Sequence, residues 1–263
     1  RRSSDLIHAD VLHSRPVVRN YGGTKIVAFY GTNDGIFHAV NGNQTTDIGS
    51  GASAVKPGGE MWGLVLPEFL GNLNRQRTAS PVLLLPSTSN GIIPAPLKKD
   101  YFVDGSTGVY QKLNADGTTQ AAYLYLTMRR GGRFIYALDV TDPANPSVKW
   151  KISSNDTGFK ELGQTWSRPR VALTNVTAHP TVLVFGGGYD ATAEDAEPPI
   201  TDTMGRGIFV IDAFTGALVW SAGNSANNPT LSVSGMNYAI PSDLAMLDRN
   251  FDGITDRLYA TDV

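Results

Sequence analysis

The chain has 263 residues, of which 41% are hydrophobic, so it can bury a substantial core as one large domain or two smaller ones. Its formal net charge is −2, and its basic residues form no cluster beyond Arg129 and Arg130, so it carries no electrostatic footprint for nucleic acid. The absence of cysteine excludes disulfides, thiolate metal sites and a cysteine nucleophile, and no apolar run approaches the ~18 residues of a membrane span.

Short apolar runs recur along the whole chain, and 28 glycines and 15 prolines separate them. Such punctuation is typical of β-strands joined by turns. Few stretches keep a helical period for more than two turns, so the chain is predicted to be all-β. Segments rich in glycine, serine, proline or acidic residues are expected to form surface loops inserted between strands: residues 49–59, 88–99 and 191–204.

One short helix is predicted within residues 60–77. Leu66, Phe69 and Leu73 are spaced there by three and four positions, which places them on one helical face. Pro67 is expected to begin the helix, because proline is favoured in a first helical turn. This helix would be an insertion in a scaffold of strands.

A repeated pattern becomes visible when the apolar runs are aligned by their ends. Four of them finish in an acidic or amide residue: Asn41, Asp139, Asp212 and Asp262. A hydrophobic strand and a glycine-rich turn precede these runs, and two of the runs continue through a turn into a strand that ends in Trp150 or Trp220. This succession predicts the four antiparallel strands of a β-propeller blade. We expect the acidic residues to cap turns and the tryptophans to pack between blades.

Near the C-terminal end, residues 248–256 have the pattern of a calcium loop. Carboxylate or amide oxygens occupy loop positions 1, 3, 5 and 9: Asp248, Asn250, Asp252 and Asp256. Ca²⁺ binds six to eight oxygens, which alternate residues of a curled loop can direct at one centre. Gly253 at position 6 permits the sharp turn, and the carbonyl of Ile254 can add a ligand. The sequence therefore predicts a Ca²⁺ site.

The loop differs from an EF-hand in two respects. Position 12, where a bidentate Glu would stand, is Tyr259. Short apolar or alternating runs at residues 244–247 and 257–261 flank the loop, so it is predicted to join two β-strands. The amide of Asn250 leaves three carboxylates, which predicts weaker binding than four would give. The competing interpretation is a hairpin turn rich in Asn, Asp and Gly that binds no metal.

Other patterns indicate no catalytic site. The four histidines lack metal-ligand spacing, and the glycines at residues 186–188 do not lead into an amphipathic helix, as a dinucleotide-binding turn would. One acidic run is interpreted as a solvated loop, with a second cation site as the alternative: Asp190, Glu194, Asp195 and Glu197.

Taken in order, these motifs resemble the C-terminal domain of the PilY/PilC family of type IV pilus biogenesis and adhesion factors. The resemblance rests on the calcium loop and on five earlier segments: residues 7–18, 30–39, 101–105, 136–143 and 163–169. It spans nearly the whole chain, and of the motifs only the calcium loop is diagnostic by itself. The resemblance implies a modified β-propeller, seven-bladed in the known case. Residues 1–263 would then form a single propeller domain with a partial set of blades, incomplete at the C-terminus.

The resemblance also implies a function. The domain would lie outside the cell, at the cell surface, the outer membrane or the pilus tip, without inserting into the membrane itself. It would use calcium to control pilus extension and retraction, twitching motility, surface attachment and virulence, with no enzymatic activity. Its partners would be pilin or minor pilin subunits and a receptor on a host cell or an abiotic surface. The family's calcium ligands correspond to Asp248, Asn250, Asp252, Asp256 and the carbonyl of Ile254.

Two other classes of protein stay open. Residues 211–220 resemble the tryptophan-docking repeat of pyrroloquinoline-quinone dehydrogenases, whose axial cofactor pocket is commonly capped by a cysteine disulfide. The absence of cysteine and the partial set of blades disfavour this enzyme. An extracellular lectin-like or integrin-type binding module would share the calcium site on a propeller and would differ only in its partner.

Overall fold

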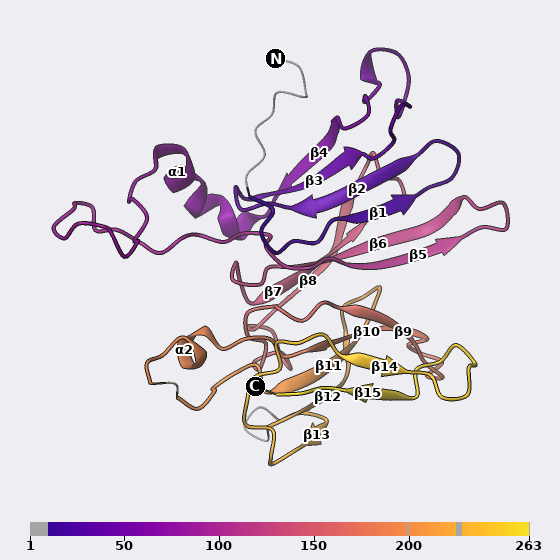
Figure 1. The fold of residues 1–263 in the computed structure, drawn as a ribbon. Helices are drawn as coiled ribbons and strands as arrows, with labels where there is room; N and C mark the ends of the chain where they lie inside the picture. The colour runs from indigo at the N-terminus through magenta and orange to yellow at the C-terminus, as the bar shows by residue number, and fades with distance from the viewer. Residues whose placement is uncertain (1–9, 199, 225–227, 263) are drawn as a thin grey trace.

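Four β-sheets make up the molecule, which we describe from a computed structural model covering residues 10–198, 200–224 and 228–262 (Figure 1). In the first sheet the spatial order follows the sequence: β1 (Val17–Asn20), β2 (Ile26–Gly31), β3 (Ile36–Asn41) and β4 (Glu60–Val65). The second sheet repeats this order: β5 (Gly108–Leu113), β6 (Thr119–Thr127), β7 (Phe134–Asp139) and β8 (Ser147–Ser153). Neighbouring strands in both sheets are antiparallel, as in the predicted blades.

The third sheet has the same four-stranded arrangement with one short addition. Its strands are β9 (Arg170–Leu173), β10 (Thr181–Gly186), β11 (Gly207–Asp212), β12 (Leu218–Gly223) and β13 (Leu231–Ser232), of which β13 pairs in parallel with β12. The fourth sheet, in the described residues, is the antiparallel pair β14 (Ala245–Leu247) and β15 (Arg257–Tyr259). Over the residues that the structure describes, the four sheets do not close into a ring.

The hydrophobic core consists of three layers, each lying between successive sheets. Phe29 of the first sheet and Leu124 of the second share the first layer. Tyr125 of the second sheet and Leu183 of the third share the second layer, and Val184 packs toward β14 and β15 in the third. Because successive residues of a strand face opposite sides, the neighbours Leu124 and Tyr125 of β6 belong to different layers. The middle sheets are therefore buried on both faces.

We call the five residues that directly precede the first strand of each sheet its approach segment. The approach segments are residues 12–16, 103–107, 165–169 and 240–244. The first residue of an approach segment lies against the end of the second strand of the preceding sheet. A Cβ atom on Gly31 would overlap the carbonyl oxygen of Val103, and one on Gly186 would overlap that of Ile240. At the third such contact, Thr165 Oγ1 accepts a hydrogen bond at 2.8 Å from the first backbone N–H after β6. Successive sheets are thus joined by close backbone contacts.

Each sheet also ties its own approach segment to the end of its second strand. Ser14 Oγ accepts a hydrogen bond from the backbone of Gly31 at 2.9 Å, and Ser167 Oγ accepts the corresponding bond from the end of β10 at 2.9 Å. In the second sheet the glycine lies in the approach segment and the hydroxyl-bearing residue ends the strand. There Gly105 N donates to the backbone carbonyl of Thr127 at 3.1 Å. A Cβ atom on Gly105 would overlap Thr127 Oγ1. A hydroxyl-bearing residue and a glycine therefore meet in all three contacts.

Within the segment predicted to contain a helix, residues 60–77, the part up to Val65 is a strand. Glu60–Val65 forms β4, which pairs along β3 from Ile36 opposite Val65 to Val40 opposite Glu60. Pairing with the edge of β3 satisfies backbone hydrogen bonds over the whole segment and overrides its local helical period. The helical part begins at Pro67, as predicted, with a 3₁₀ turn (η3, Pro67–Phe69) followed by α1 (Leu70–Thr78).

The structure also contains helical turns outside the one segment predicted to be helical. Two of the segments predicted as loops contain a short 3₁₀ turn (η2, Gly51–Ser53) and a one-turn helix, α2 (Ala191–Glu194). In the part of the chain that the structure describes, no helix is long and apolar enough to cross a membrane.

Three of the four predicted blade corners are confirmed. Asn41, Asp139 and Asp212 end the third strands of their sheets, and the Oδ1 atom of each accepts the backbone N–H two residues further on, at 2.9, 2.9 and 3.0 Å. Asp262 does not belong with them. It follows β15, which corresponds to a second strand, because β14 and its approach segment begin the fourth sheet. Trp150 packs between sheets as expected, and its Nε1 donates to the carbonyl of Ala213 at 3.2 Å.

Gly186→Ala should destabilise the protein by about 1–3 kcal/mol, because its Cβ atom would overlap the carbonyl oxygen of Ile240 and push two sheets apart. Gly71→Ala is the matched control, since a Cβ atom there meets nothing within 4 Å and α1 gains a better helix former. It should raise stability by about 0.5–1 kcal/mol. Denaturant unfolding measures both variants, and wild-type stability of Gly186→Ala would contradict the close contact.

Candidate metal centre

The predicted calcium loop joins two antiparallel strands, as expected. Asp248 directly follows β14, Asp256 directly precedes β15, and Leu247 pairs with Arg257 across the base of the loop. Shorter turns hold the same position between first and second strands in the other sheets: residues 21–25, 114–118 and 174–180. The calcium loop is thus an enlarged turn at a position common to all four sheets.

Asp248 organises the first half of the loop. Its Oδ1 accepts a hydrogen bond from Phe251 N at 2.7 Å, and its Oδ2 accepts one from Gly253 N at 2.8 Å. Gly253 has a φ of +85°, in the region that favours glycine, as the sequence pattern requires. Phe251 also has a positive φ, of +61°, and its side chain is 91% exposed. The backbone therefore curls around loop position 1.

Hydrogen bonds within the loop also hold the remaining predicted side-chain ligands. Asp252 Oδ1 accepts from Ile254 N at 2.8 Å, and Asp252 Oδ2 accepts from Asn250 Nδ2 at 3.0 Å. Asp256 Oδ2 accepts from Arg249 N at 2.7 Å, which connects the end of the loop to its beginning. The structure thus brings all the predicted ligands into one hydrogen-bonded loop.

The donor set suits a hard cation, although its carboxylates are not gathered around one point. Among the described residues, no group of three or more His, Cys, Asp and Glu side chains lies together as a metal site requires. The loop carboxylates instead accept N–H groups of the loop itself. An ionised carboxylate offers about four lone-pair sites, so each can keep these bonds and still bind a cation. Calcium binding therefore stays a prediction, and it requires the loop to bring the free sides of these carboxylates to a common centre.

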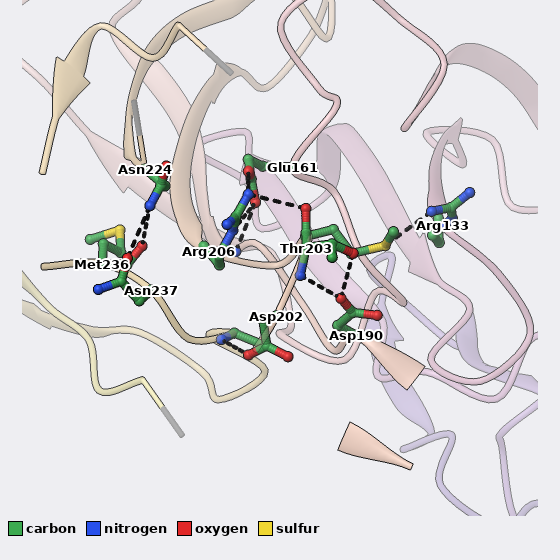
Figure 2. A network of polar contacts seen from close by, with 11 residues as sticks. Arg133, Glu161, Asp190, Asp202, Thr203, Arg206, Asn224, Met236 and Asn237 are labelled. Atoms are coloured by element: carbon green, nitrogen blue, oxygen red, sulfur yellow. Dashed lines mark hydrogen bonds and ion pairs between the residues drawn. The ribbon is translucent and has the colours of Figure 1, made fainter. Parts of the chain in front are cut away.

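The acidic run at residues 190–197 is only partly solvated. Asp190 is fully buried, and its Oδ2 accepts bonds from the N and Oγ1 atoms of Thr203 at 2.8 and 2.9 Å (Figure 2). Its Oδ1 caps α2 by accepting a bond from Thr192 N at 3.0 Å. Burial acts to raise the pKa of Asp190, but the bonds from Thr203 and from α2 outweigh it and lower that pKa. The predicted solvated loop is therefore wrong for Asp190, which fastens the two ends of the insertion together.

Asp202 is a second buried carboxylate in this insertion. Its Oδ2 accepts a hydrogen bond from Ala239 N at 2.6 Å, whereas its Oδ1 is buried without a hydrogen-bond partner among the described residues (Figure 2). Burial raises the pKa of Asp202, and burial together with the Asp202 charge raises the pKa of Glu194. A separate ion pair lies nearby, in which Arg206 Nη2 donates to Glu161 Oε1 at 2.6 Å, and it does not involve these two carboxyl groups. The charged form of both Asp202 and Glu194 is therefore disfavoured.

A polar pocket of about 510 Å³ between the approach segments was not predicted. Arg129 and Trp166, which line it, entered the sequence predictions only as part of a basic pair and as part of a motif. The signal that could have found the pocket is the recurrence of Ser-Arg-Pro at residues 14–16 and 167–169. These triplets stand at equivalent positions in two approach segments, so their neighbours converge in space.

Asp202→Asn should stabilise the protein at neutral pH, because it removes a buried charge. A carboxyl group whose folded pKa is raised above its ordinary 3.8 costs stability when ionised, and this cost disappears as the pH falls through the folded pKa. Asn removes the charge and keeps an acceptor for Ala239. The gain should therefore be present at about pH 8 and shrink at about pH 4 in thermal unfolding.

Asp190→Asn is the control with the opposite sign. Because the folded pKa of Asp190 is lowered, its charge contributes stability above the ordinary pKa, and that contribution is lost as the pH falls. The variant should therefore be less stable than wild type at neutral pH. Equal effects of the two substitutions would contradict this account of the insertion.

Comparison with known proteins identifies the family. Residues 94–263 match the family model of the PilY1 beta-propeller domain. The type IV pilus biogenesis factor PilY1 homolog of Xylella fastidiosa is 29% identical over 242 residues, which are 90% of this chain and 15% of that protein. Type IV pilus biogenesis factor PilY1 of Pseudomonas aeruginosa PAO1 is 30% identical over 169 residues, which are 62% of this chain and 12% of that protein. The chain thus spans a small part of the relatives it matches.

A solved structure shows the same fold. The crystal structure of the Pseudomonas aeruginosa PilY1 C-terminal domain superposes with a TM-score of 0.56 and 22% identity, over 90% of this chain and 36% of that one. This likeness confirms the predicted β-propeller architecture, and in the described residues of this chain the sheets are not closed into a ring. Because the matched family model also covers more than half of the chain, the protein belongs to the PilY1 β-propeller domain family.

Proposed function

We propose that this domain acts in type IV pilus biogenesis as a calcium-responsive propeller without enzymatic activity. Membership of the PilY1 β-propeller family and the naming of its relatives as pilus biogenesis factors support the pilus role. The domain would lie at the cell surface or pilus tip and would influence pilus extension, retraction, twitching motility and surface attachment. Pilin or minor pilin subunits and a surface receptor would be its partners.

The observation that carries the calcium part of this proposal is the attachment of the loop to a neighbouring sheet. Thr255 N donates to the carbonyl of Leu173, the last residue of β9, at 3.0 Å. The loop therefore belongs to the fourth sheet and is bonded to the third. Three carboxylates at residues 248, 252 and 256 repel one another, and a Ca²⁺ ion among them would remove that repulsion. Ordering the loop would then tighten the contact between two sheets and alter the surface they present.

The purified protein should bind one Ca²⁺, and Asp252→Ala should lose this binding. Asp252 supplies one of three loop charges, so its removal should lower the affinity on the order of a hundredfold or more. Mg²⁺ should compete poorly, because it demands a smaller octahedral shell and releases water reluctantly. Calorimetry measures the affinities. Thermal unfolding should show the linked stabilisation, about 2.7 kcal/mol at a hundredfold excess of Ca²⁺ over Kd.

Asp116→Ala is the matched control for this experiment. Asp116 lies in the turn at residues 114–118, the counterpart of the calcium loop in the second sheet, and its Oδ1 accepts from Thr118 N at 2.9 Å. That turn has a single carboxylate, so the substitution should leave calcium binding unchanged. If wild type and Asp252→Ala bind Ca²⁺ equally, or neither binds at millimolar calcium, the loop is only a turn.

The pilus part of the proposal has its own test in cells. Asp252→Ala in the full-length protein should change pilus assembly or retraction without abolishing expression, while Asp116→Ala should leave both unchanged. Normal twitching motility of an expressed Asp252→Ala strain that has lost calcium binding would show that the metal does not control the pilus.

A further inference from the structure

All four sheets contribute to the polar pocket of about 510 Å³ that lies among the approach segments. Arg15, Ser106, Trp166 and Asp243 each come from a different approach segment, and Arg129 follows β6. Pockets of roughly 300–1,000 Å³ are typical of small-ligand sites, and such sites usually place a few polar groups where elements converge. The position and size of this pocket therefore suit a ligand site.

The guanidinium of Arg129 is held in a fixed position with unused donors. It lies over the ring of Trp166, 4.1 Å from the centroid, and Trp166 stacks in turn on Tyr189 at 4.4 Å between centroids. The Nε atom of Arg129 is buried and, among the described residues, has no hydrogen-bond partner. Stacking uses the face of the guanidinium and leaves its edge, which carries the N–H donors, available to an acceptor. A buried donor without a partner is costly, and a ligand can satisfy it.

The balance of charge in the pocket is positive. The nearby carboxylate of Asp104 already accepts hydrogen bonds from His13 Nδ1 at 2.6 Å and from Asn33 Nδ2 at 2.9 Å. Burial lowers the pKa of Arg129, an effect that Asp104 opposes and the like charges of Arg130 and Arg15 reinforce. Within the described residues, neither Arg129 nor Arg15 makes an ion pair. Two cations of the pocket thus lack an anionic partner.

The carboxylate that lines the pocket, Asp243, has a partner of its own. Asp243 accepts a hydrogen bond from Arg168 N at 2.8 Å, and its other oxygen lies 3.9 Å from Arg168 Nε. It therefore does not compensate Arg15 or Arg129. Its negative charge nevertheless disfavours a ligand with two charges on one group, such as a phosphate dianion.

We propose that this pocket binds a carboxylate, which Arg129 holds edge-on through paired N–H bonds while Arg15 completes the neutralisation. A carboxylate is planar, carries a single charge and matches the fork of a guanidinium. It can come from an acidic side chain or chain terminus of a partner protein or from a free organic acid. The proposal concerns a different part of the sheets from the calcium loop and does not depend on it.

Titration of the purified full chain with succinate and with a short Gly-Glu peptide tests the proposal. Calorimetry and tryptophan fluorescence should show saturable binding of at least one of them, with Trp166 reporting because it contacts Arg129. Arg129→Gln should weaken binding about tenfold or more, since it removes both the charge and the fork. Arg129→Lys should recover only part of the loss, because a point charge lacks the fork.

Two further variants keep the test decisive. Arg15→Gln alters an exposed residue, so it should fold normally and still weaken binding severalfold. Arg130→Gln is the matched control, because Arg130 neighbours Arg129, lies 5.2 Å from the same indole and faces Asp195 at 3.6 Å. It should bind like wild type.

The choice of ligands separates the sources of the carboxylate and the ways the proposal can fail. Binding of the peptide alone would indicate a partner protein, and binding of succinate alone a free organic acid. The proposal is wrong if neither ligand saturates at ~10 mM, which corresponds to an affinity too weak for a specific site. It is also wrong if neutral succinamide or inorganic phosphate binds as well as succinate, or if Arg129→Gln and Arg15→Gln both bind as wild type does.

Discussion

The close backbone contact between one sheet and the approach segment of the next determines how the sheets are spaced. At Gly31 and Gly186 no side chain fits between the strand and the neighbouring carbonyl oxygen, so two sheets come together at the distance of backbone contact. That spacing brings apolar side chains of facing sheets into shared layers, where burial contributes about 25 cal/mol per Å² of apolar surface. It also gathers the approach segments, which is why residues from four sheets line one pocket.

The first strand of the fourth sheet separates the two candidate sites. Asp243 of the pocket precedes β14 and Asp248 of the calcium loop follows it, so the sites lie at opposite ends of one short strand. At about 3.3 Å per residue, such a strand spans roughly 10 Å. The ends differ in construction. Close contacts between glycines and carbonyl groups fix the approach segments, whereas the turns at the other end vary in length from sheet to sheet and leave room for a metal loop.

Local sequence patterns predicted the features that depend on residues close together in the chain. They failed for features that depend on strand pairing or on burial between distant segments. The position of residues 248–256 between two strands was predicted correctly because the pattern and its flanking runs lie within one short segment, whereas calcium binding by this loop stays a prediction. Asp262 was assigned to the wrong strand, since second and third strands both end an apolar run with a polar residue. Glu60–Val65 became a strand because the edge of β3 was available to pair with it. Burial of Asp190 depends on donors brought by folding, and Arg129 and Trp166 meet only when separate sheets converge.

The sharing of core layers between sheets limits how this kind of protein can change in evolution. Leu124 and Leu126 of β6 contact the preceding sheet, while Tyr125 contacts the following one. A tandem duplication of this sheet would set its Tyr125 face against a copy of its leucine face, a combination that the core layers of the described residues do not contain. New blades could arise by duplication only where the two faces of one sheet are complementary to each other. Otherwise each added copy would need matching substitutions on both faces before it could be retained.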